Sequence, residues 1–345
     1  MSIRSLLMVI SFVLSILIGL IISQNQVTPP SNRDNQIVIG LSLDTLKEAR
    51  WQKDRDIFVS YAKELGADVL VQAANSDDTT QMQNIEALIS RRVDVLVIVP
   101  HNGKAMAKAV EKAHEAGIPV IAYDRIIQDC DVDVYISFDN VKVGEMQATF
   151  LLDSLSNHGK IIRIYGSKTD NNAFLFKKGQ DNILEPYIKK GMIEVIHEDW
   201  AEDWKPENGK KITNAAISLH GENFTAVLAA NDGTAGGAIQ ALTEEGLAGK
   251  IMVIGQDAEL VACQRIVQGT QSMTIYKPLK KLAQRAARLA IDMAKRKVIV
   301  AQESTDNGKI NVPTIAIDVQ AVTKKNMEQT IIKDGFHDRK DIFNE

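Results

Sequence analysis

Short acidic and amide side chains follow five apolar runs of strand length, and this repetition is the clearest sign of chemistry in the chain. The residues that follow the runs are Asp44, Asp124-Arg125, Asp170-Asn171-Asn172, Asn231-Asp232 and Asp257. Taken singly, each fits a helix N-cap equally well, because carboxylate and amide oxygens accept hydrogen bonds from the first turn of a helix. Five together, with cationic and aromatic residues nearby, predict one polar binding pocket.

The common motifs of enzymes and metal proteins are missing from the sequence. It contains no G-x-G-x-x-G, no G-x-x-x-x-G-K-[ST] and no G-x-S-x-G, and its six histidines lack metal-ligand spacing. Gly233 to Gly237 follow a strand, but their spacing predicts close helix packing rather than a phosphate loop. The acidic loop from Glu198 to Trp204 lacks the calcium-loop pattern, so we expect a solvated loop. We therefore expect no catalysis, no metal and no cofactor.

Apolar runs separated by helical patterns predict an open α/β fold. Near-continuous Val, Ile and Leu runs indicate sheets that are covered on both faces. In open α/β sheets, ligands bind at the carboxyl ends of the strands, which is where the five polar groups stand. The predicted strands are Ile37–Leu43, Val69–Ala73, Val95–Val99, Val120–Tyr123, Ile161–Tyr165, Glu194–Ile196, Ala226–Ala230, Met252–Ile254, Ser272–Ile275 and Thr314–Ile317.

Composition narrows the classes of partner. The net charge is −4 and the pI is about 5.9, which argues against a nucleic-acid partner because phosphate binding needs clustered cations. The two cysteines, Cys130 and Cys263, are far apart in sequence and do not form a disulfide framework. We expect them to be free or buried thiols.

An ordered set of motifs resembles the bacterial D-xylose-binding proteins, a subgroup of the type I periplasmic binding proteins. The resemblance runs from about residue 36 to Phe336. The segments that carry it are Ala49–Asp56 (ARWQKDRD), Ala122–Arg125 (AYDR), Tyr135–Asn140 (YISFDN), Asp170–Ala173 (DNNA), Trp204–Asn208 (WKPEN), Asn231-Asp232, Gly236–Leu242 (GGAIQAL), Gly255–Ala258 (GQDA) and Thr274–Pro278 (TIYKP).

The resemblance implies two Rossmann-like lobes with parallel-type sheets, joined by a three-crossing hinge. The first lobe would comprise residues 36–140 and 277–309, and the second lobe residues 141–276 and 310–345. The crossings would fall near Asp139-Asn140, Tyr276-Lys277 and Gly308–Asn311.

The resemblance also implies ten sugar contacts. They are Lys47, Arg50, Asp124, Arg125, Asp170, Asn172, Trp204, Asn231, Asp257 and Lys277. Carboxylates, cations and amides match sugar hydroxyls, and Trp204 would lie against the C–H face of the ring. Lys47 stands where the family often has arginine, so its contact is in question. Trp51, at a helix start, is expected to pack in the core rather than against ligand.

The first residues predict a location outside the cytoplasm. Residues Leu6 to Ile22 form an uncharged run of seventeen residues, about 25 Å long as a helix, which is just enough to cross a bilayer. No A-x-A site stands at its end, and this region contains no cysteine. We therefore favour an uncleaved signal anchor in residues 1–23 with a linker in residues 24–35, over a cleaved signal peptide. The binding body would lie on the extracellular or periplasmic side of the cell membrane.

Two outputs are compatible with such a receptor. A tether without a lipid-bearing cysteine slightly favours a xylose sensor that reports to a membrane histidine kinase of a two-component system. The alternative is the substrate-binding component of a xylose ABC importer, with a permease as the partner. An effector domain of a transcription factor shares the implied fold, but it would carry a DNA-binding motif where this chain has an apolar run.

Overall fold

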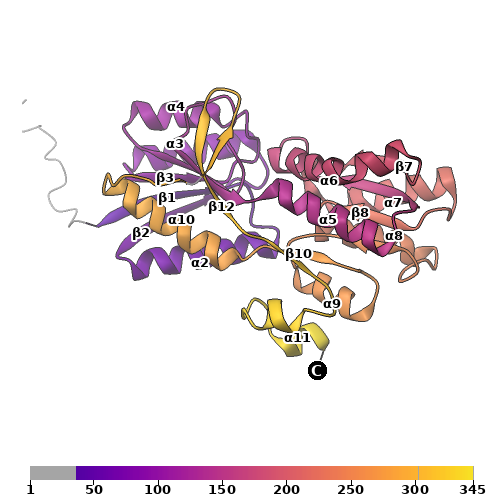
Figure 1. Ribbon diagram of the computed structural model, residues 1–345. Coiled ribbons are helices and arrows are strands. Elements are labelled where there is room, and N and C mark those ends of the chain that lie inside the picture. Colours follow the sequence, from indigo (N-terminus) through magenta and orange to yellow (C-terminus); the bar gives the residue numbers. More distant parts are fainter. Residues whose placement is uncertain (1–35, 302, 345) are drawn as a thin grey trace, which may run out of the picture. The chain divides into compact units, whose positions relative to one another are not determined.

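The computed structural model describes residues 36–301 and 303–344, in which strands and helices alternate along the chain (Figure 1). All ten predicted strands are present, several with shifted ends. The predicted membrane segment (1–23) and linker (24–35) lie outside the described residues. Within the described part, no helix has both the length and the apolar character needed to cross a bilayer.

The larger sheet has seven strands in the order β11-β12-β5-β4-β3-β1-β2. Neighbouring strands are parallel, except that β11 and β12 are antiparallel. Alternate side chains point to opposite faces of a strand, and here both faces are apolar, so the sheet is buried on both sides. The bounds are β1 Ile37–Leu43, β2 Ala67–Ala73, β3 Val95–Ile98, β4 Val120–Tyr123, β5 Val134–Phe138, β11 Glu303–Asp306 and β12 Asn311–Ile317.

Four helices cover this sheet. Helices α2 (Ala49–Glu64) and α10 (Leu279–Ala294) pack on one face, where Val95 and Val97 of β3 point. Helices α3 (Asp78–Ser90) and α4 (Ala107–Glu115) pack on the other face, against Leu96 and Ile98. We call this sheet with its four helices the first lobe.

The smaller sheet has four parallel strands in the order β7-β6-β8-β9. Helices α5 and α6 cover one face, and α7 and α8 cover the other. The bounds are α5 Asn140–Ser154, β6 Gly159–Tyr165, α6 Asn171–Lys189, β7 Ile193–Trp200, α7 Pro206–His220, β8 Ala226–Ala229, α8 Asp232–Glu244 and β9 Met252–Ile254. We call this sheet with its helices, together with β10, β13 and α9 described below, the second lobe.

The glycines after β8 serve helix packing, as the sequence predicts. A Cβ atom on Gly237 of α8 would stand 1.8 Å from the backbone oxygen of Pro206, and one on Gly209 of α7 would stand 2.3 Å from that of Thr234. Side chains at these positions would push the two helices apart.

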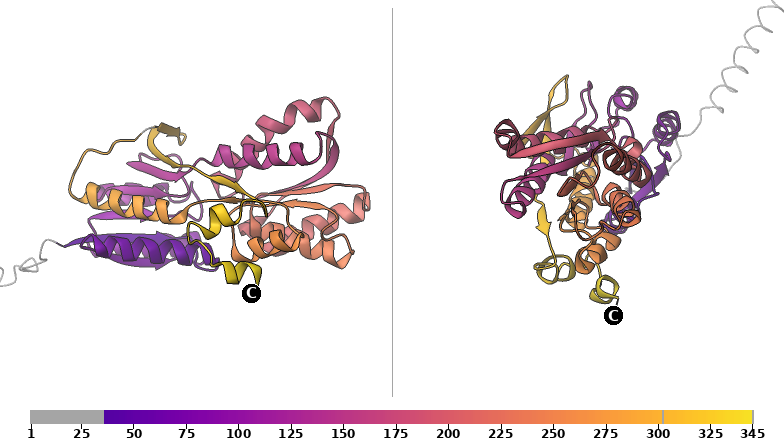
Figure 2. Two further views of the ribbon diagram at one scale, coloured as in Figure 1. Left: turned by 60° about the horizontal axis from the view of Figure 1, so that its bottom comes forward. Right: turned by 90° about the vertical axis from the view of Figure 1, so that its right-hand side faces the viewer.

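The C-terminal part of the chain adds a smaller apolar cluster. Strands β10 (Thr274–Tyr276) and β13 (Gln320–Val322) pair antiparallel. Helix α11 (Arg339–Phe343) packs beside α9 (Leu260–Gln268), and η2 (Glu328–Ile332) joins the same cluster (Figures 1 and 2). Both cysteines are free and buried, as expected from the sequence.

The chain passes between the two sheets at three places, and the third differs from the expectation. Strand β5 leads directly into α5, and β10 is followed by α10 after Lys277-Pro278. The resemblance predicts that residues 310–345 belong to the second lobe, but β12 (Asn311–Ile317) pairs with β5 in the first sheet. The third passage therefore lies between β12 and β13, near Asp318, because the apolar side chains of β12 extend the first sheet before the chain crosses.

Candidate sugar-binding site

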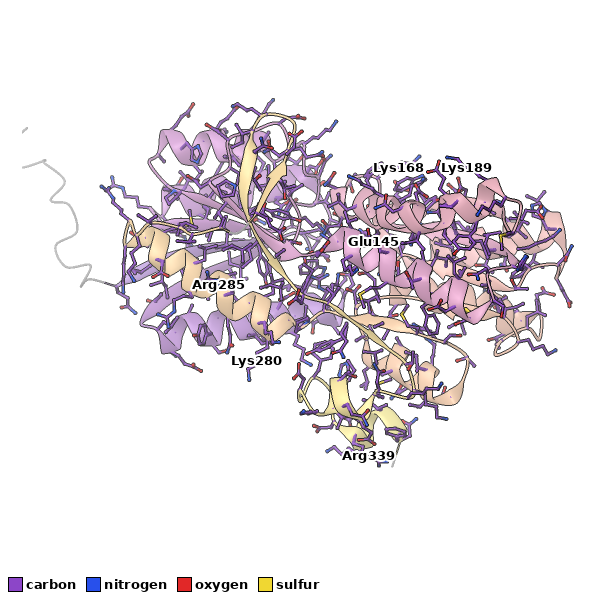
Figure 3. All side chains as sticks on the ribbon, viewed as in Figure 1. Glu145, Lys168, Lys189, Lys280, Arg285 and Arg339 are labelled. Carbon is purple, nitrogen blue, oxygen red and sulfur yellow. The ribbon has the colours of Figure 1, made fainter. Side chains whose placement is uncertain are left out.

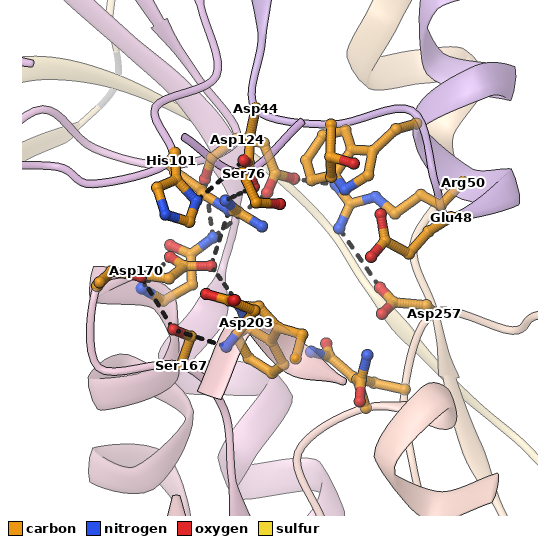
Figure 4. A pocket seen from close by; sticks show the side chains of 18 of the residues that line it. Asp44, Glu48, Arg50, Ser76, His101, Asp124, Ser167, Asp170, Asp203 and Asp257 are labelled. Carbon is orange, nitrogen blue, oxygen red and sulfur yellow. Dashed lines mark hydrogen bonds and ion pairs between the residues drawn. The ribbon is translucent and has the colours of Figure 1, made fainter. Parts of the chain in front are cut away.

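One pocket opens between the carboxyl ends of the two sheets, and both lobes line it (Figure 4). About 50 Å³ of the pocket can hold the centre of a water molecule, and the space free of protein atoms, which includes solvent at the open mouth, is about 660 Å³. Nine of the ten predicted contacts line it: Arg50, Asp124, Arg125, Asp170, Asn172, Trp204, Asn231, Asp257 and Lys277.

Lys47 is the exception among the predicted contacts. Its side chain is exposed, and it does not line the pocket. Its backbone N–H donates to Oγ1 of Thr45, which fixes the short turn before α2. The turn directs Arg50, one residue into α2, toward the pocket and leaves Lys47 in solvent.

Arg50 is the first cation of the site. Its guanidinium contacts Asp124 at the end of β4, and lies 3.5 Å from both Asp54 and Asp257. Burial disfavours its charge, but the three carboxylates outweigh burial and raise the pKa of Arg50 above its ordinary value. It therefore stays charged and links the first lobe to Asp257 of the second.

Arg125 is the second cation, and it also spans both lobes. One guanidinium nitrogen lies 2.7 Å from Asp44, at the end of β1, and donates to the backbone oxygen of Pro100. Its Nε lies 2.8 Å from Asp170, the N-cap of α6. Burial opposes the charge of Arg125, but Asp170 and Asp44 raise its pKa above the ordinary range.

Asp124 sits in the left-handed backbone region, with φ of 62°. Burial alone would raise its pKa, but Arg50 and Lys277 together lower it below the ordinary value, so this carboxylate is charged. Its backbone oxygen accepts from Tyr135, Ser137 and Asn172. Asn172 thereby ties α6 of the second lobe to β4 of the first.

Trp204 forms an aromatic wall on the second lobe. Its indole N–H donates to Asp170 over 3.2 Å, and its ring meets Phe176 edge-on. A Cβ atom on Gly166 would stand 2.0 Å from this ring, so only glycine leaves room for it. The indole is held on two sides and presents a rigid surface to the pocket.

Asp257 and Lys277 complete the ion pairs. Asp257 follows β9 with φ of 100°, and its carboxylate lies 2.8 Å from Nζ of Lys277. Lys277 is 2% exposed and lies two residues before α10, so its cation is buried where the chain passes between the lobes. Asn231 caps α8 by accepting from the backbone N–H of Thr234.

Several lining residues are not among the ten predicted contacts, although Asp44 is one of the five strand-end groups that predict the pocket. Asp44 carries the same strand-end signal as the predicted contacts, and His101 lies 3.0 Å from it just beyond β3. Glu48 and Gln256 line the pocket with side-chain oxygens, Oε2 and Oε1, that have no hydrogen-bond partner among the described residues. These two oxygens are free to accept ligand hydroxyl groups.

Glu259 also lines the pocket, near Asp257. Burial and, after it, the charge of Asp257 raise the pKa of Glu259 to about 7. Trp51, expected in the core, is 4% exposed and packs there, yet it lines the pocket as well. The guanidinium of Arg50 lies 4.3 Å from the centre of its ring, which helps to orient the arginine.

Comparison with known proteins gives a consistent picture. A family model described as "Periplasmic binding protein domain" matches residues 39–297. The D-xylose-binding periplasmic proteins of Haemophilus influenzae and Escherichia coli are each 47% identical to this chain. The alignments cover 91% and 89% of the chain and 94% and 93% of those proteins. A carbohydrate transporter solute binding protein of Chloroflexus aurantiacus, solved with D-glucose, is 32% identical, with a TM-score of 0.83 over 89% of this chain and 98% of that one.

Proposed function

We propose that this chain, which belongs to the periplasmic binding protein family, is an extracytoplasmic receptor for D-xylose. The observation that carries the proposal is its 47% identity, over about nine tenths of its length, to two D-xylose-binding proteins. The pocket supports it, because cations, carboxylates and amides from both lobes converge on a space beside Trp204.

These residue types suit a pentose. Carboxylates such as Asp257 accept hydroxyl hydrogens, and Arg50 and Lys277 donate to hydroxyl oxygens. The rigid indole of Trp204 offers an apolar surface for the C–H face of a pyranose. A hexose carries one more hydroxymethyl group, which the aromatic wall of Trp204 would exclude sterically. Analogues that lack a hydroxyl would leave buried polar groups unpaired, which costs binding energy.

Receptor action would follow from closure of the lobes. A sugar that contacts both walls favours the closed arrangement by the difference between its affinities for the closed and open forms. The ion pairs Arg50–Asp257 and Arg125–Asp170 already connect the two lobes. A bound sugar would therefore strengthen a closed arrangement that the protein can form by itself. A membrane partner would recognise the closed form.

For the output, we favour a xylose sensor that signals through a two-component histidine kinase while an N-terminal anchor holds it at the membrane. The apolar run from Leu6 to Ile22, without a lipid-bearing cysteine, supports this choice. Xylose delivery to an ABC importer is the second candidate, since one similar solved protein is a carbohydrate transporter solute binding protein. Affinity purification of the full-length chain from its native membrane distinguishes them: recovery of permease subunits without a kinase contradicts the sensor.

A ligand panel tests the sugar assignment. Thermal unfolding is followed with D-xylose, L-arabinose, D-ribose and D-glucose, each at several concentrations. A ligand that binds the folded state stabilises it by RT ln(1 + [L]/Kd), so xylose should raise Tm at the lowest concentration. A larger shift with glucose would move the proposal to a hexose receptor.

A further inference from the structure

Helix α10 presents an unusual row of cations to the outside of the first lobe. Lys281, Arg285, Arg288 and Lys295 are spaced three, four or seven residues apart, so they share one face of the helix, and Lys280 stands beside them. All five side chains are exposed, and among the described residues none makes an ion pair. Figure 3 shows Lys280 and Arg285 at the outer side of this helix.

Comparison with α6 shows that this row is not ordinary surface charge. Along α6, Lys177 lies 2.7 Å from Asp181, and Lys189 lies 2.8 Å from Glu185, so cations and acids alternate. From Leu279 to Lys297 the only acid is Asp292, which pairs with Lys297. The whole chain has a net charge of −4, so the cationic row runs against its overall charge.

Exposed apolar side chains continue the row. Val298 is 90% exposed and Val300 is 73% exposed, directly after the basic segment Lys295–Lys297. Val300 also lines a shallow groove with Tyr61, Arg285 and Ile317 along α10. Cations beside exposed branched aliphatic residues are the combination that an anionic lipid surface attracts. Each cation near such a surface increases the binding constant for the membrane by about tenfold or less.

The chain enters the first lobe at the same end. Strand β1 begins at Ile37, and the backbone N–H of Val38 donates to Asp94. Asp94 and Arg296 line one hollow, so β1 begins next to the last turn of α10. The apolar run Leu6–Ile22 is joined to this point by residues 23–36, which reach at most about 50 Å.

We propose that the outer face of α10, with Val298 and Val300, docks on the surface of an anionic phospholipid bilayer. Charge complementarity selects the lipid headgroups, and β1 begins beside the end of α10 that carries Arg296. The proposal rests on the membrane attachment proposed above. Docking would fix the first lobe against the membrane and leave the second lobe free to close over the pocket.

The experiment places a fluorophore at the proposed contact. The full-length chain carrying Val298→Cys is labelled and reconstituted into vesicles of phosphatidylglycerol and phosphatidylcholine that contain a headgroup-attached quencher. Cys130 and Cys263 are fully buried, so the label goes to the new cysteine. The control label is at Leu219→Cys, which is 70% exposed on α7 of the second lobe.

We expect strong quenching at residue 298 and weak quenching at residue 219. Pure phosphatidylcholine, or high salt, should reduce quenching at 298 because the attraction is electrostatic. Arg285→Glu with Arg288→Glu should lower the ratio of docked to undocked protein about tenfold or more. The matched pair Lys178→Glu with Lys190→Glu, at exposed positions of the second lobe, should leave the ratio unchanged.

Four results overturn the proposal. Equal quenching at residues 298 and 219 rejects a lipid-facing α10, and so does quenching that ignores lipid charge. A chain that does not float with either vesicle rejects both docking and membrane attachment. If labels stay unquenched while the Arg285/Arg288 variant loses a co-purifying membrane protein, the row binds an acidic protein instead. Xylose binding to the same samples is measured separately by titration. It tests the receptor function independently of docking, because the α10 substitutions lie outside the pocket.

Discussion

The pocket has two walls, one formed by each lobe, and their charged groups are organised differently. On the first-lobe wall, the charged groups pair mostly with one another: Asp44 with Arg125 and His101, and Arg50 with Asp54 and Asp124. On the second-lobe wall, the carboxylates of Asp170 and Asp257 obtain their cations from the first lobe and from Lys277 between the lobes. The first wall is therefore held in place by its own contacts, whereas the second wall depends on the approach of the first.

The largest expected effect comes from removing Arg125, which serves both walls. Arg125→Ala leaves Asp44 and Asp170 buried without their cation, so we expect the free energy of unfolding to fall by about 3–5 kcal/mol. Xylose affinity should fall by about 30-fold or more, as measured by calorimetry at a temperature where the variant is folded.

Arg163 provides the control for that experiment. It is a buried arginine of the second lobe, bonded to Gln180 and Asp181 away from the pocket. Arg163→Ala should destabilise the fold and keep xylose affinity. Equal loss of affinity in both variants would show that Arg125 acts only through stability.

Trp204 tests the aromatic part of the second wall. Trp204→Ala should weaken xylose binding by about 2 kcal/mol, because the sugar loses its apolar surface. Trp200→Ala is the matched control, since Trp200 stacks on Tyr165 and Phe174 and does not line the pocket. Unchanged affinity on loss of Trp204 would remove the aromatic wall from the site.

Glu259 makes the second wall sensitive to pH. Burial first and Asp257 next raise its pKa to about 7, from 4.5 for an exposed glutamate. Between these values the folded protein holds a proton that the unfolded chain has released, so this group makes stability fall as pH rises from 4.5 to 7. The substitution Glu259→Gln should remove this decrease of stability with rising pH.

The pH effect is measured as a difference between proteins. Relative to the wild type, Glu259→Gln should gain about 1–2 kcal/mol of stability on going from pH 5 to pH 8, by urea unfolding. The exposed Glu245→Gln should show no such gain. A gain in both variants, or in neither, would contradict the assignment.

The smallest effect is expected at Lys47. Its side chain is exposed outside the pocket, so Lys47→Ala should change xylose affinity by less than about 0.5 kcal/mol. Lys277→Ala, which removes a buried cation from Asp257, is the contrasting variant. A tenfold loss of affinity at Lys47 would restore it as a ligand contact.

The fold was predictable where strands are long and apolar. Three strands are absent from the predicted set: β5, whose five residues follow the acidic segment Asp131–Asp133, the polar strand β11, and the three-residue strand β13. Strand β11 pairs only with β12 at the sheet edge, so its pairing leaves no apolar pattern in the sequence. The third passage between the lobes was misplaced because β12 alone does not show which sheet it joins.

The site was predictable where a polar residue ends a strand. Asp124 and Asp257 follow directly from that rule, and Asp44 shares the signal. Glu48 and Glu259 do not end strands, and they reach the pocket because the two lobes face each other there. Placement that depends on the packing of two lobes leaves no local pattern in the sequence. The resemblance to known proteins implied ten contacts, and Glu48 and Glu259 are not among them.

A crystal structure of the protein grown with D-xylose tests the central claim most directly. We predict one pyranose beside Trp204, with hydrogen bonds from Arg50 of the first wall and from Asp257 of the second. Xylose bound to one wall alone, or at a site outside this pocket, would contradict the account.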